Sequence, residues 1–298
     1  MTTTTVFDSV FGTCVLTPLC AAFLYTPEHY RLKDIAMNNA DVLYPSVRYS
    51  RREHCIAVME LARRWASRLT ADERLIDLVA LVGLYHDVGH VALSHSMDHY
   101  LQQSVGIPDH ETRSAHLLLR VNSRLGNRLS PPEARFVCDA ITGSISEDTC
   151  FPLWAYHVVH QPDRSLPDVD RIVYLCHDSH KLGFSSGIDV DWIMECLYID
   201  EHSGGLAFSL ACMPSLRHIV DLRGTLFLEV FEHDTVAAYQ SFLVARFCAL
   251  YTMDRVGALF QDFAWLELTD VLLWSVLNGD EKTMRMLAER TYMVVSDG

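Results

Sequence analysis

The chain has 298 residues, half of them hydrophobic, and a formal net charge of −14 at pH 7. This length and composition allow one sizeable core, so we expect one large domain or a domain with a helical extension. The acidic balance argues against a general nucleic-acid binder, which would normally carry a basic surface, but not against a nucleotide bound by local cations. No apolar run reaches the roughly eighteen residues of a membrane-spanning helix, so we expect none.

The nine cysteines occur without a Cys-x-x-Cys pair, which favours free thiols in a reducing compartment. The N-terminal stretch Met-Thr-Thr-Thr-Thr-Val lacks the basic region of a signal peptide. We therefore expect a soluble intracellular protein of the cytoplasm or nucleus.

Taken in order, the first fifty residues predict a short strand or hairpin near Val6 to Leu16, and a helix from about Pro27. Residues 51–69 and 72–88 predict two helices, and the stretch Thr70-Ala-Asp-Glu73 fits a capping box for the second. The run from 75 to 84 is so dense in Leu and Val that we expect this helix to be buried on most sides.

A further helix is predicted from Asp109 through Leu119, and Ser130-Pro-Pro-Glu133 is typical of another helix start. Residues 151–167 are predicted to be irregular and 168–183 helical. A short helix at 190–198 and a hairpin around residues 202–205 follow, and the stretches 214–251 and 266–295 are predicted to be helical. The expected fold class is mainly α with a small β element.

Histidines and aspartates gather directly after the apolar run. His86 and His90 are four apart and share a helix face, while His95 and Asp98 are three apart. Neutral imidazole and carboxylate are good ligands for a divalent transition metal. Any one of these histidines could equally be a solvated residue at a helix end, but the constellation favours a metal site, because an unpartnered buried aspartate would be costly.

Two further segments supply the remaining ligands. His54 begins the predicted helix at 51–69, and Asp170 begins the one at 168–183, where Tyr174 and Asp178 continue the same helical stripe. The resulting order, His…His-Asp…Asp, is that of the HD superfamily of metal-dependent phosphohydrolases.

The chain resembles the HD-domain dNTP triphosphohydrolases, most closely the HD domain of the vertebrate type that also carries a sterile-alpha-motif. The resemblance is strongest at Gly83-Leu-x-His-Asp-x-Gly-His90 and continues in Thr26-Pro-x-x-x-Arg-Leu-Lys33, Arg51-x-Glu-His54 and Asp168-Val-Asp170, then weakly to Leu268-Thr-Asp270. It implies an HD phosphohydrolase domain over residues 1–210 and a C-terminal helical lobe over 211–298 that completes the nucleotide site.

The resemblance also implies roles for individual residues. His95 would be the general acid, aligned by Asp98, with an imidazole pKa that is ordinarily about 6.5 and so near operating pH. The metal ligands would be His54, His86, Asp87 and Asp170; the other catalytic residues His90, His110 and Glu111; and the substrate-binding residues Arg51, Arg171, Tyr174, Asp178, Arg223 and Phe231. The expected cofactor is one divalent transition metal, Fe, Mn, Zn or Co, with Mg accompanying the substrate phosphates.

Two departures from the family pattern concern selectivity and regulation. Phe231 and Glu232 stand where the family has a tyrosine and a glutamine near sugar and base, and residues 37–39 replace the loop that excludes a 2′-hydroxyl. The residues of the family's activating guanine-nucleotide site look like Thr5, Tyr25, Tyr30 and Lys33 here. Because tyrosine cannot accept two N–H bonds from guanine as an aspartate does, we expect activity without a guanine-nucleotide activator.

The expected function is metal-dependent hydrolysis of dNTPs to deoxynucleoside and inorganic triphosphate. The alternatives are an HD phosphohydrolase for a nucleoside mono- or diphosphate or a cyclic nucleotide, and a nucleotide-binding protein with a retired site. The expected partners are a nucleotide substrate and further copies of the chain, as the family tends to assemble, but neither a membrane nor nucleic acid.

Overall fold

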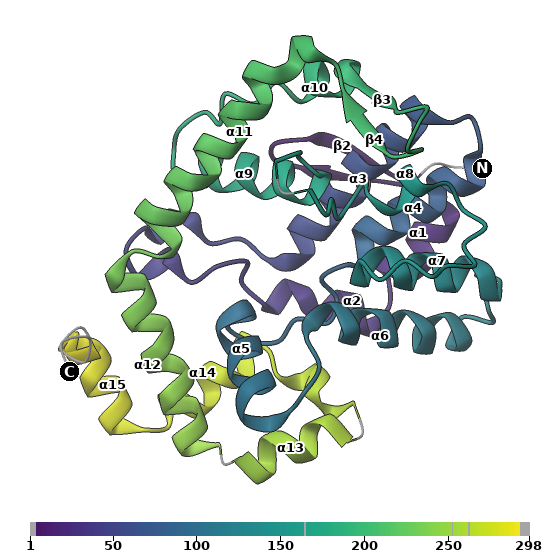
Figure 1. The fold of residues 1–298 in the computed structure, drawn as a ribbon. Coiled ribbons are helices and arrows are strands. Elements are labelled where there is room, and N and C mark those ends of the chain that lie inside the picture. Colours follow the sequence, from purple (N-terminus) through teal and green to yellow (C-terminus); the bar gives the residue numbers. More distant parts are fainter. Residues whose placement is uncertain (1–3, 164, 252, 262, 293–298) are drawn as a thin grey trace. The chain divides into compact units, whose positions relative to one another are not determined.

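The computed structural model describes residues 4–163, 165–251, 253–261 and 263–292 (Figure 1). The chain forms two compact units, and each is built from three separate stretches. Unit 1 comprises Met1–Tyr30, Glu53–Gly89 and Glu111–Gly224, and unit 2 comprises Arg31–Arg52, His90–His110 and Thr225–Gly298. The division expected after residue 210 stays a prediction.

Helices make up most of the described chain, which confirms the mainly α class. They are α1 (Pro18–Leu24), α2 (Pro27–Tyr30), α3 (Arg51–Leu69), α4 (Glu73–Tyr85), α5 (Ser94–Val105), α6 (His110–Arg124), α7 (Pro131–Thr142), α8 (Leu153–Tyr156), α9 (Val169–Lys181), α10 (Val190–Cys196), α11 (Met213–Leu226), α12 (Asp234–Leu250), α13 (Met253–Gln261), α14 (Asp270–Asn278) and α15 (Glu281–Ala288). A π-helical turn, Phe227–Phe231, follows α11.

Both predicted hairpins are confirmed. Strands β1 (Thr4–Asp8) and β2 (Gly12–Leu16) pair antiparallel with Val6 opposite Cys14, and β3 (Leu197–Ile199) pairs with β4 (Leu206–Phe208). Gly204 lies between the second pair with φ of 70°, a left-handed conformation that glycine adopts readily.

The starts of three helices show which capping predictions hold. Helix α7 starts where it was predicted, with Ser130 as its N-cap, and Ser130 and Glu133 form a capping box in which the Ser130 N–H donates to Glu133 Oε2 at 2.7 Å. The box predicted at Thr70 for α4 is wrong, because Asp72 is the N-cap and accepts from the N–H groups of Arg74 and Leu75. Asp168 caps α9 in the same way, accepting from the Arg171 N–H at 2.8 Å.

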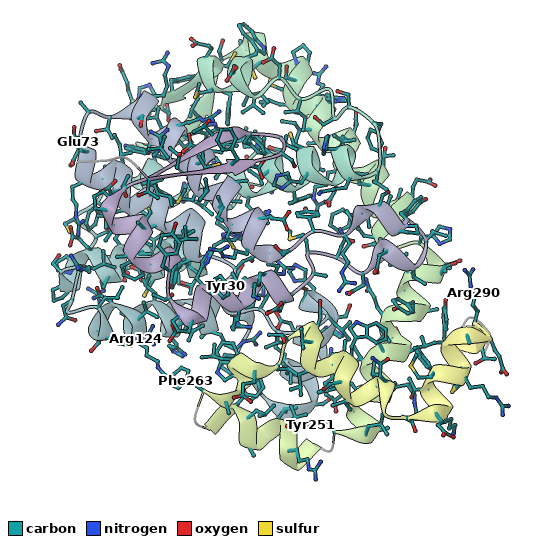
Figure 2. All side chains as sticks on the ribbon, turned by 180° about the vertical axis from the view of Figure 1, so that it is seen from behind. Tyr30, Glu73, Arg124, Tyr251, Phe263 and Arg290 are labelled. Atoms are coloured by element: carbon teal, nitrogen blue, oxygen red, sulfur yellow. The ribbon has the colours of Figure 1, made fainter. Side chains whose placement is uncertain are left out.

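Several helix boundaries differ from prediction. The helix predicted from Pro27 is a single turn followed by a 3-10 turn, Arg31–Asp34, and the predicted irregular stretch 151–167 contains the short helix α8. Helix α6 continues past Leu119 because its apolar face does, and Arg124 at its end (labelled in Figure 2) donates twice to the buried carboxylate of Glu28 at 2.6 Å. Helix α4 ends at Tyr85, so His86 and Asp87 lie just beyond it rather than inside it.

Unit 1 holds helices α3 and α9 together through the β1–β2 hairpin (Figure 1). The buried carboxylate of Glu60 on α3 accepts from the Val15 N–H at 3.0 Å, and Asp8 in the hairpin lies 2.9 Å from Nε2 of His177 on α9. Helix α4 packs against α1 and α7. The two helices that carry His54 and Asp170 are thus fixed to the same ribbon.

In unit 2, α12 packs against α5 and α14, and α14 packs against α15. Helix α5, whose second residue is His95, therefore packs against the C-terminal helix α12. None of the helices in the described part of the chain combines the length and apolar character that crossing a membrane requires.

Candidate metal centre and histidine cluster

Gly83 allows α3 and α4 to approach closely in unit 1. A Cβ at this position would lie 2.9 Å from the Val58 carbonyl oxygen, a distance that real Cβ atoms essentially never show, and 3.0 Å from the Met59 Cα, which is tighter than most Cβ contacts. Because both atoms are backbone, they could not rotate away. The glycine therefore sets the spacing at which His54 of α3 meets His86 at the end of α4.

Three ligand atoms meet there, from α3, from the end of α4 and from the first turn of α9. The Nε2 of His54 lies 2.8 Å from Oδ1 of Asp170 and 3.3 Å from Nε2 of His86, while His86 Nε2 lies 3.6 Å from Asp170 Oδ1. All three atoms fall within 4.8 Å of one another. Asp87 is buried beside them, with its carboxylate 3.5 Å from His86 Nε2 and 3.8 Å from His54 Nε2.

These spacings fit one metal ion. Ligands bound at about 2.0–2.2 Å around a single ion stand roughly 3–3.5 Å from each other in tetrahedral or octahedral arrangements. The separations among His54, His86 and Asp170 bracket that range. Asp87 is at its upper limit from His86 and slightly beyond it from His54. The mixed imidazole and carboxylate donor set suits Fe, Mn, Zn or Co. The structure thus brings all four predicted ligands together.

The surroundings orient the ligands and set their charge. His86 Nδ1 lies 2.8 Å from the Gly83 carbonyl oxygen, so Nδ1–H donates there and Nε2 faces the cluster. Burial disfavours a charged His86, but Asp87 and Asp170 outweigh it and raise its pKa to about 9, so a metal ion bound at Nε2 would displace a proton. Burial lowers the pKa of His54. Burial would raise the pKa of Asp170, but hydrogen bonds from both imidazoles bring it well below its usual value, so the carboxylate is ionised.

Unit 2 contains a second group, His90, His95, Asp98 and His110, whose nitrogen and oxygen atoms also lie within 4.8 Å of one another. The rings of His90 and His110 are stacked, with centroids 3.8 Å apart and an angle of 16° between their planes. A metal ion lies in the plane of each imidazole that binds it, and no single position lies in the planes of two stacked rings. This geometry favours proton handling or phosphate binding over a second metal.

Asp98 orients this cluster. Its Oδ2 lies 2.8 Å from Nδ1 of His110 and 3.4 Å from Nδ1 of His90. His95 meets the stack edge-on, with centroids 4.8 Å from His90 and 5.2 Å from His110, and its side chain is exposed while His90 and Asp98 are buried. The predicted alignment of His95 by Asp98 stays a prediction.

The predicted substrate residues of unit 1 lie on α9 and α11. Tyr174 is half-buried, and its hydroxyl accepts from Arg223 Nε at 3.1 Å. Asp178 is buried one helical turn further along α9. Arg171 binds within its own helix start, donating to the Leu166 carbonyl at 2.8 Å and lying 3.5 Å from Asp168. A phosphate role for Arg171 stays a prediction.

The other predicted residues occupy different surroundings. Arg51 is only 1% exposed in unit 2, and its Nε donates to the Ser94 hydroxyl at 2.7 Å. Glu111, in unit 1, lies 4.0 Å from Nδ1 of His160. Phe231 ends the π-helical turn and meets Phe227 edge-on at 5.7 Å. The roles assigned to these three stay predictions.

Residues 51–181, which contain all four candidate metal ligands, match the family described as the HD domain. The chain carries a stretch that is similar to the HD domain. The family consists of phosphohydrolases that bind divalent metals, and the His and Asp cluster of unit 1 has the composition for such an ion. The predicted resemblance is confirmed at this level.

Named relatives are distant. The chain is 22% identical over 294 residues to an HD domain-containing protein of Acanthamoeba polyphaga mimivirus, covering 91% of the chain and 63% of the relative. It is 28% identical to the deoxynucleoside triphosphate triphosphohydrolase SAMHD1 homologue of Dictyostelium discoideum, covering 63% of the chain and 38% of that protein. It is 26% identical to the deoxynucleoside triphosphate triphosphohydrolase SAMHD1 of Gallus gallus, and the match covers 61% of the chain and 34% of that protein. The chain thus spans between about a third and two thirds of these relatives.

A solved structure shares the fold. A hypothetical protein from Aquifex aeolicus superposes with a TM-score of 0.82 at 20% sequence identity, covering 97% of this chain and 76% of its own. This chain therefore shares its fold with that protein over nearly its whole length.

Three residues with structural roles in unit 1 were not predicted. Gly83 belongs to the quoted motif, and an isolated glycine inside an apolar helical run was the available signal for a close backbone approach. Arg113 and Ser114 of α6 both bind the backbone of Gly89. Arg113 Nε donates to the Gly89 carbonyl at 2.9 Å, and the Gly89 N–H donates to Ser114 Oγ at 2.8 Å. Nothing in the local sequence signals that contact.

Proposed function

We propose that this protein is a metal-dependent hydrolase that cleaves deoxynucleoside triphosphates to deoxynucleoside and inorganic triphosphate. The observation that carries the proposal is the cluster of His54, His86 and Asp170 with Asp87 beside it, at separations suited to one ion. The HD family supports the phosphohydrolase class. The names of the distant relatives support the dNTP substrate.

In the proposed reaction, water adds to the α-phosphorus and the bond from that phosphorus to the 5′-oxygen breaks. A divalent ion held by the four ligands would supply Lewis-acid polarisation of a phosphate oxygen. The triphosphate leaves with the new oxygen, and the 5′-oxygen must take up a proton. Hydrolysis therefore needs a general acid from the chain.

His95 is the proposed acid. Its side chain is exposed and so is accessible to a substrate oxygen, whereas its neighbour His90 is buried. Oδ2 of Asp98 lies 2.8 Å from Nδ1 of His110, where it would orient that ring for contact with a phosphate oxygen or a proton. We assign His90 and His110 to phosphate binding and proton exchange, with Glu111 in support. General acid catalysis of this kind typically contributes ~10²–10⁴ in rate.

The proposed sugar contacts come from α9. The Tyr174 hydroxyl accepts from Arg223, so the pair would act as one element, with the tyrosine ring toward the sugar and the guanidinium toward phosphate. Asp178 would accept from a sugar hydroxyl. Arg51 and Arg171 are the other proposed phosphate cations, and Phe231 would stack on the substrate. Mg is expected to accompany the phosphates.

A second candidate is an HD phosphohydrolase for a mono- or diphosphate or a cyclic nucleotide. Phe231 and Glu232 favour it, because they replace the polar side chains with which the family reads sugar and base. A retired site is less compatible with four ligands at metal-binding distances.

The test is to incubate purified protein, loaded separately with Mn, Fe, Co or Zn, with dATP, ATP, dAMP and a cyclic nucleotide, and to identify the phosphate products by chromatography. Triphosphate from dATP supports the proposal; orthophosphate or pyrophosphate, or turnover only of the other nucleotides, supports the second candidate. The His95→Ala protein, prepared identically, controls for contaminating phosphatases.

A further inference from the structure

The segment that leads into His95 has an unusual backbone. Leu93 and Ser94 follow each other with φ of 60° and 48°, both in the left-handed region that residues other than glycine rarely adopt. Neither residue can readily adopt an ordinary backbone conformation, because the Ser94 N–H donates to the Val91 carbonyl at 3.0 Å and α5 begins at Ser94. Such a conformation persists only where surrounding structure holds it.

The contacts that hold this turn come from distant parts of unit 2. The Leu93 N–H donates to Oδ1 of Asp270 at 3.2 Å, and the Ala92 N–H donates to the Leu268 carbonyl at 2.8 Å. Ser94 Oγ accepts from Arg51 and donates to the Ala36 carbonyl at 3.0 Å. Among the C-terminal helices as far as residue 292, with residues 252 and 262 set aside, the Asp270 bond is the one that reaches a left-handed residue through a side chain.

Asp270 spans two segments at once. While Oδ1 accepts from Leu93, its Oδ2 accepts from the Ala36 N–H at 2.8 Å. The side chain is buried at the first position of α14, so both oxygens are committed to backbone donors. An ionised carboxylate offers an acceptor on each oxygen, whereas an asparagine offers one acceptor oxygen and one NH₂ donor.

We propose that Asp270 is a positioning residue that holds the 91–94 turn in its left-handed form and thereby fixes where His95 begins α5. The consequence for turnover rests on the proposed function, in which His95 is the general acid. Asp270 itself touches neither substrate nor metal in this account.

Asp270→Asn is the appropriate change, because it preserves size and shape but must turn an NH₂ group toward either Leu93 or Ala36. Its matched control is Asp280→Asn. In the wild type Asp280 is another carboxylate of unit 2, which caps α15 by accepting from the Thr283 N–H at 2.9 Å and does not contact the turn. A general loss of helix stability would affect both variants alike.

Amide hydrogen exchange of the turn gives a result that does not depend on activity. In Asp270→Asn, peptides covering residues 91–95 should exchange faster than in wild type, while Asp280→Asn should leave them unchanged. Unchanged exchange at 91–95 in Asp270→Asn would overturn the proposal, even if wild type proved inactive toward dNTPs and the proposed function failed by itself.

With active protein, kinetics test the connection to His95. Displacement of a catalytic group by about an ångström typically costs up to ~10²-fold in rate, so we expect kcat of Asp270→Asn to fall roughly 10- to 10²-fold with KM and metal content preserved. In a His95→Ala background the same substitution should have little further effect on kcat, because its route of action is gone. A normal kcat, or an equal loss in both backgrounds, would refute the positioning role.

Discussion

Replacing Gly83 by alanine should weaken metal binding, because it forces α3 and α4 apart. The added Cβ would stand 2.9 Å from the Val58 carbonyl oxygen, and ordinary van der Waals contact begins at 3.4 Å. The helices must therefore separate by about 3.4 − 2.9 = 0.5 Å. Overpacking of this kind typically costs ~1–3 kcal/mol.

The displacement acts on the ligands directly. His54 lies on α3 and would move with that helix, while the imidazole of His86 is oriented by the carbonyl of residue 83 itself. Disturbing such orienting contacts usually costs ~10–100-fold in metal affinity, which competition with a chromophoric chelator would measure, alongside thermal unfolding of the metal-free protein. Gly257→Ala on α13 is the control, since no described atom lies within 4 Å of its Cβ and stability should be unchanged or up to ~1 kcal/mol higher. Wild-type affinity in Gly83→Ala would refute the reasoning.

The remaining predictions concern single groups. Asp87→Ala should lower the bound metal found by elemental analysis, because a carboxylate 3.5 Å from His86 Nε2 is removed. His95→Ala should retain its metal but lose at least ~10²-fold in turnover. Arg74 holds the pKa of Glu133 at about 2, below its ordinary 4.5, so this carboxylate stabilises the fold above pH 4.5 and ceases to do so as pH falls toward 2. Urea unfolding of wild type and Glu133→Gln should therefore differ at pH 7 and converge at low pH. Rates with dATP as sole nucleotide should not change when GTP is added, because Tyr25 and Tyr30 replace the residues that would read guanine.

Each of these can fail in a recognisable way. Equal metal content in wild type and Asp87→Ala would remove Asp87 from the ligand set. Near-normal turnover of His95→Ala would make His95 merely structural. A constant gap between wild type and Glu133→Gln at all pH values would exclude the Arg74 pairing as its source. Protein that is silent with dATP alone and strongly activated by GTP would show that the exposed Tyr25 and Tyr30 surface was misinterpreted.

The metal centre could be predicted from sequence because its signals are local. His86 and Asp87 follow an apolar helical run, His54 and Asp170 each begin a helix of clear periodicity, and the motif fixes their order. Both hairpins were predictable from turn residues, and the helix start at Ser130 from its cap. The box at Thr70 failed because Asp72, nearer the helix, competes for the same backbone N–H groups.

The supporting contacts could not be predicted, because they join residues far apart in the chain. The hydrogen bond from the Leu93 N–H to Asp270 joins residues 177 positions apart, and the sequence near either residue does not indicate it. Arg51 is of the residue type that binds phosphate at a surface, yet its side chain is buried and donates to the Ser94 hydroxyl. The sequence does not indicate this contact, because the tertiary fold brings Ser94 to Arg51. The stacking of His90 on His110 likewise depends on how the chain returns after α5, and it changes the chemistry expected of the pair.

The most direct test of the account is hydrolysis of dATP in ¹⁸O-labelled water by metal-loaded protein, with mass analysis of both products. Water added to the α-phosphorus puts one ¹⁸O into inorganic triphosphate and none into deoxyadenosine, and Asp170→Ala should release neither. Label in orthophosphate or pyrophosphate, label in deoxyadenosine, or equal turnover by Asp170→Ala would contradict the proposed chemistry.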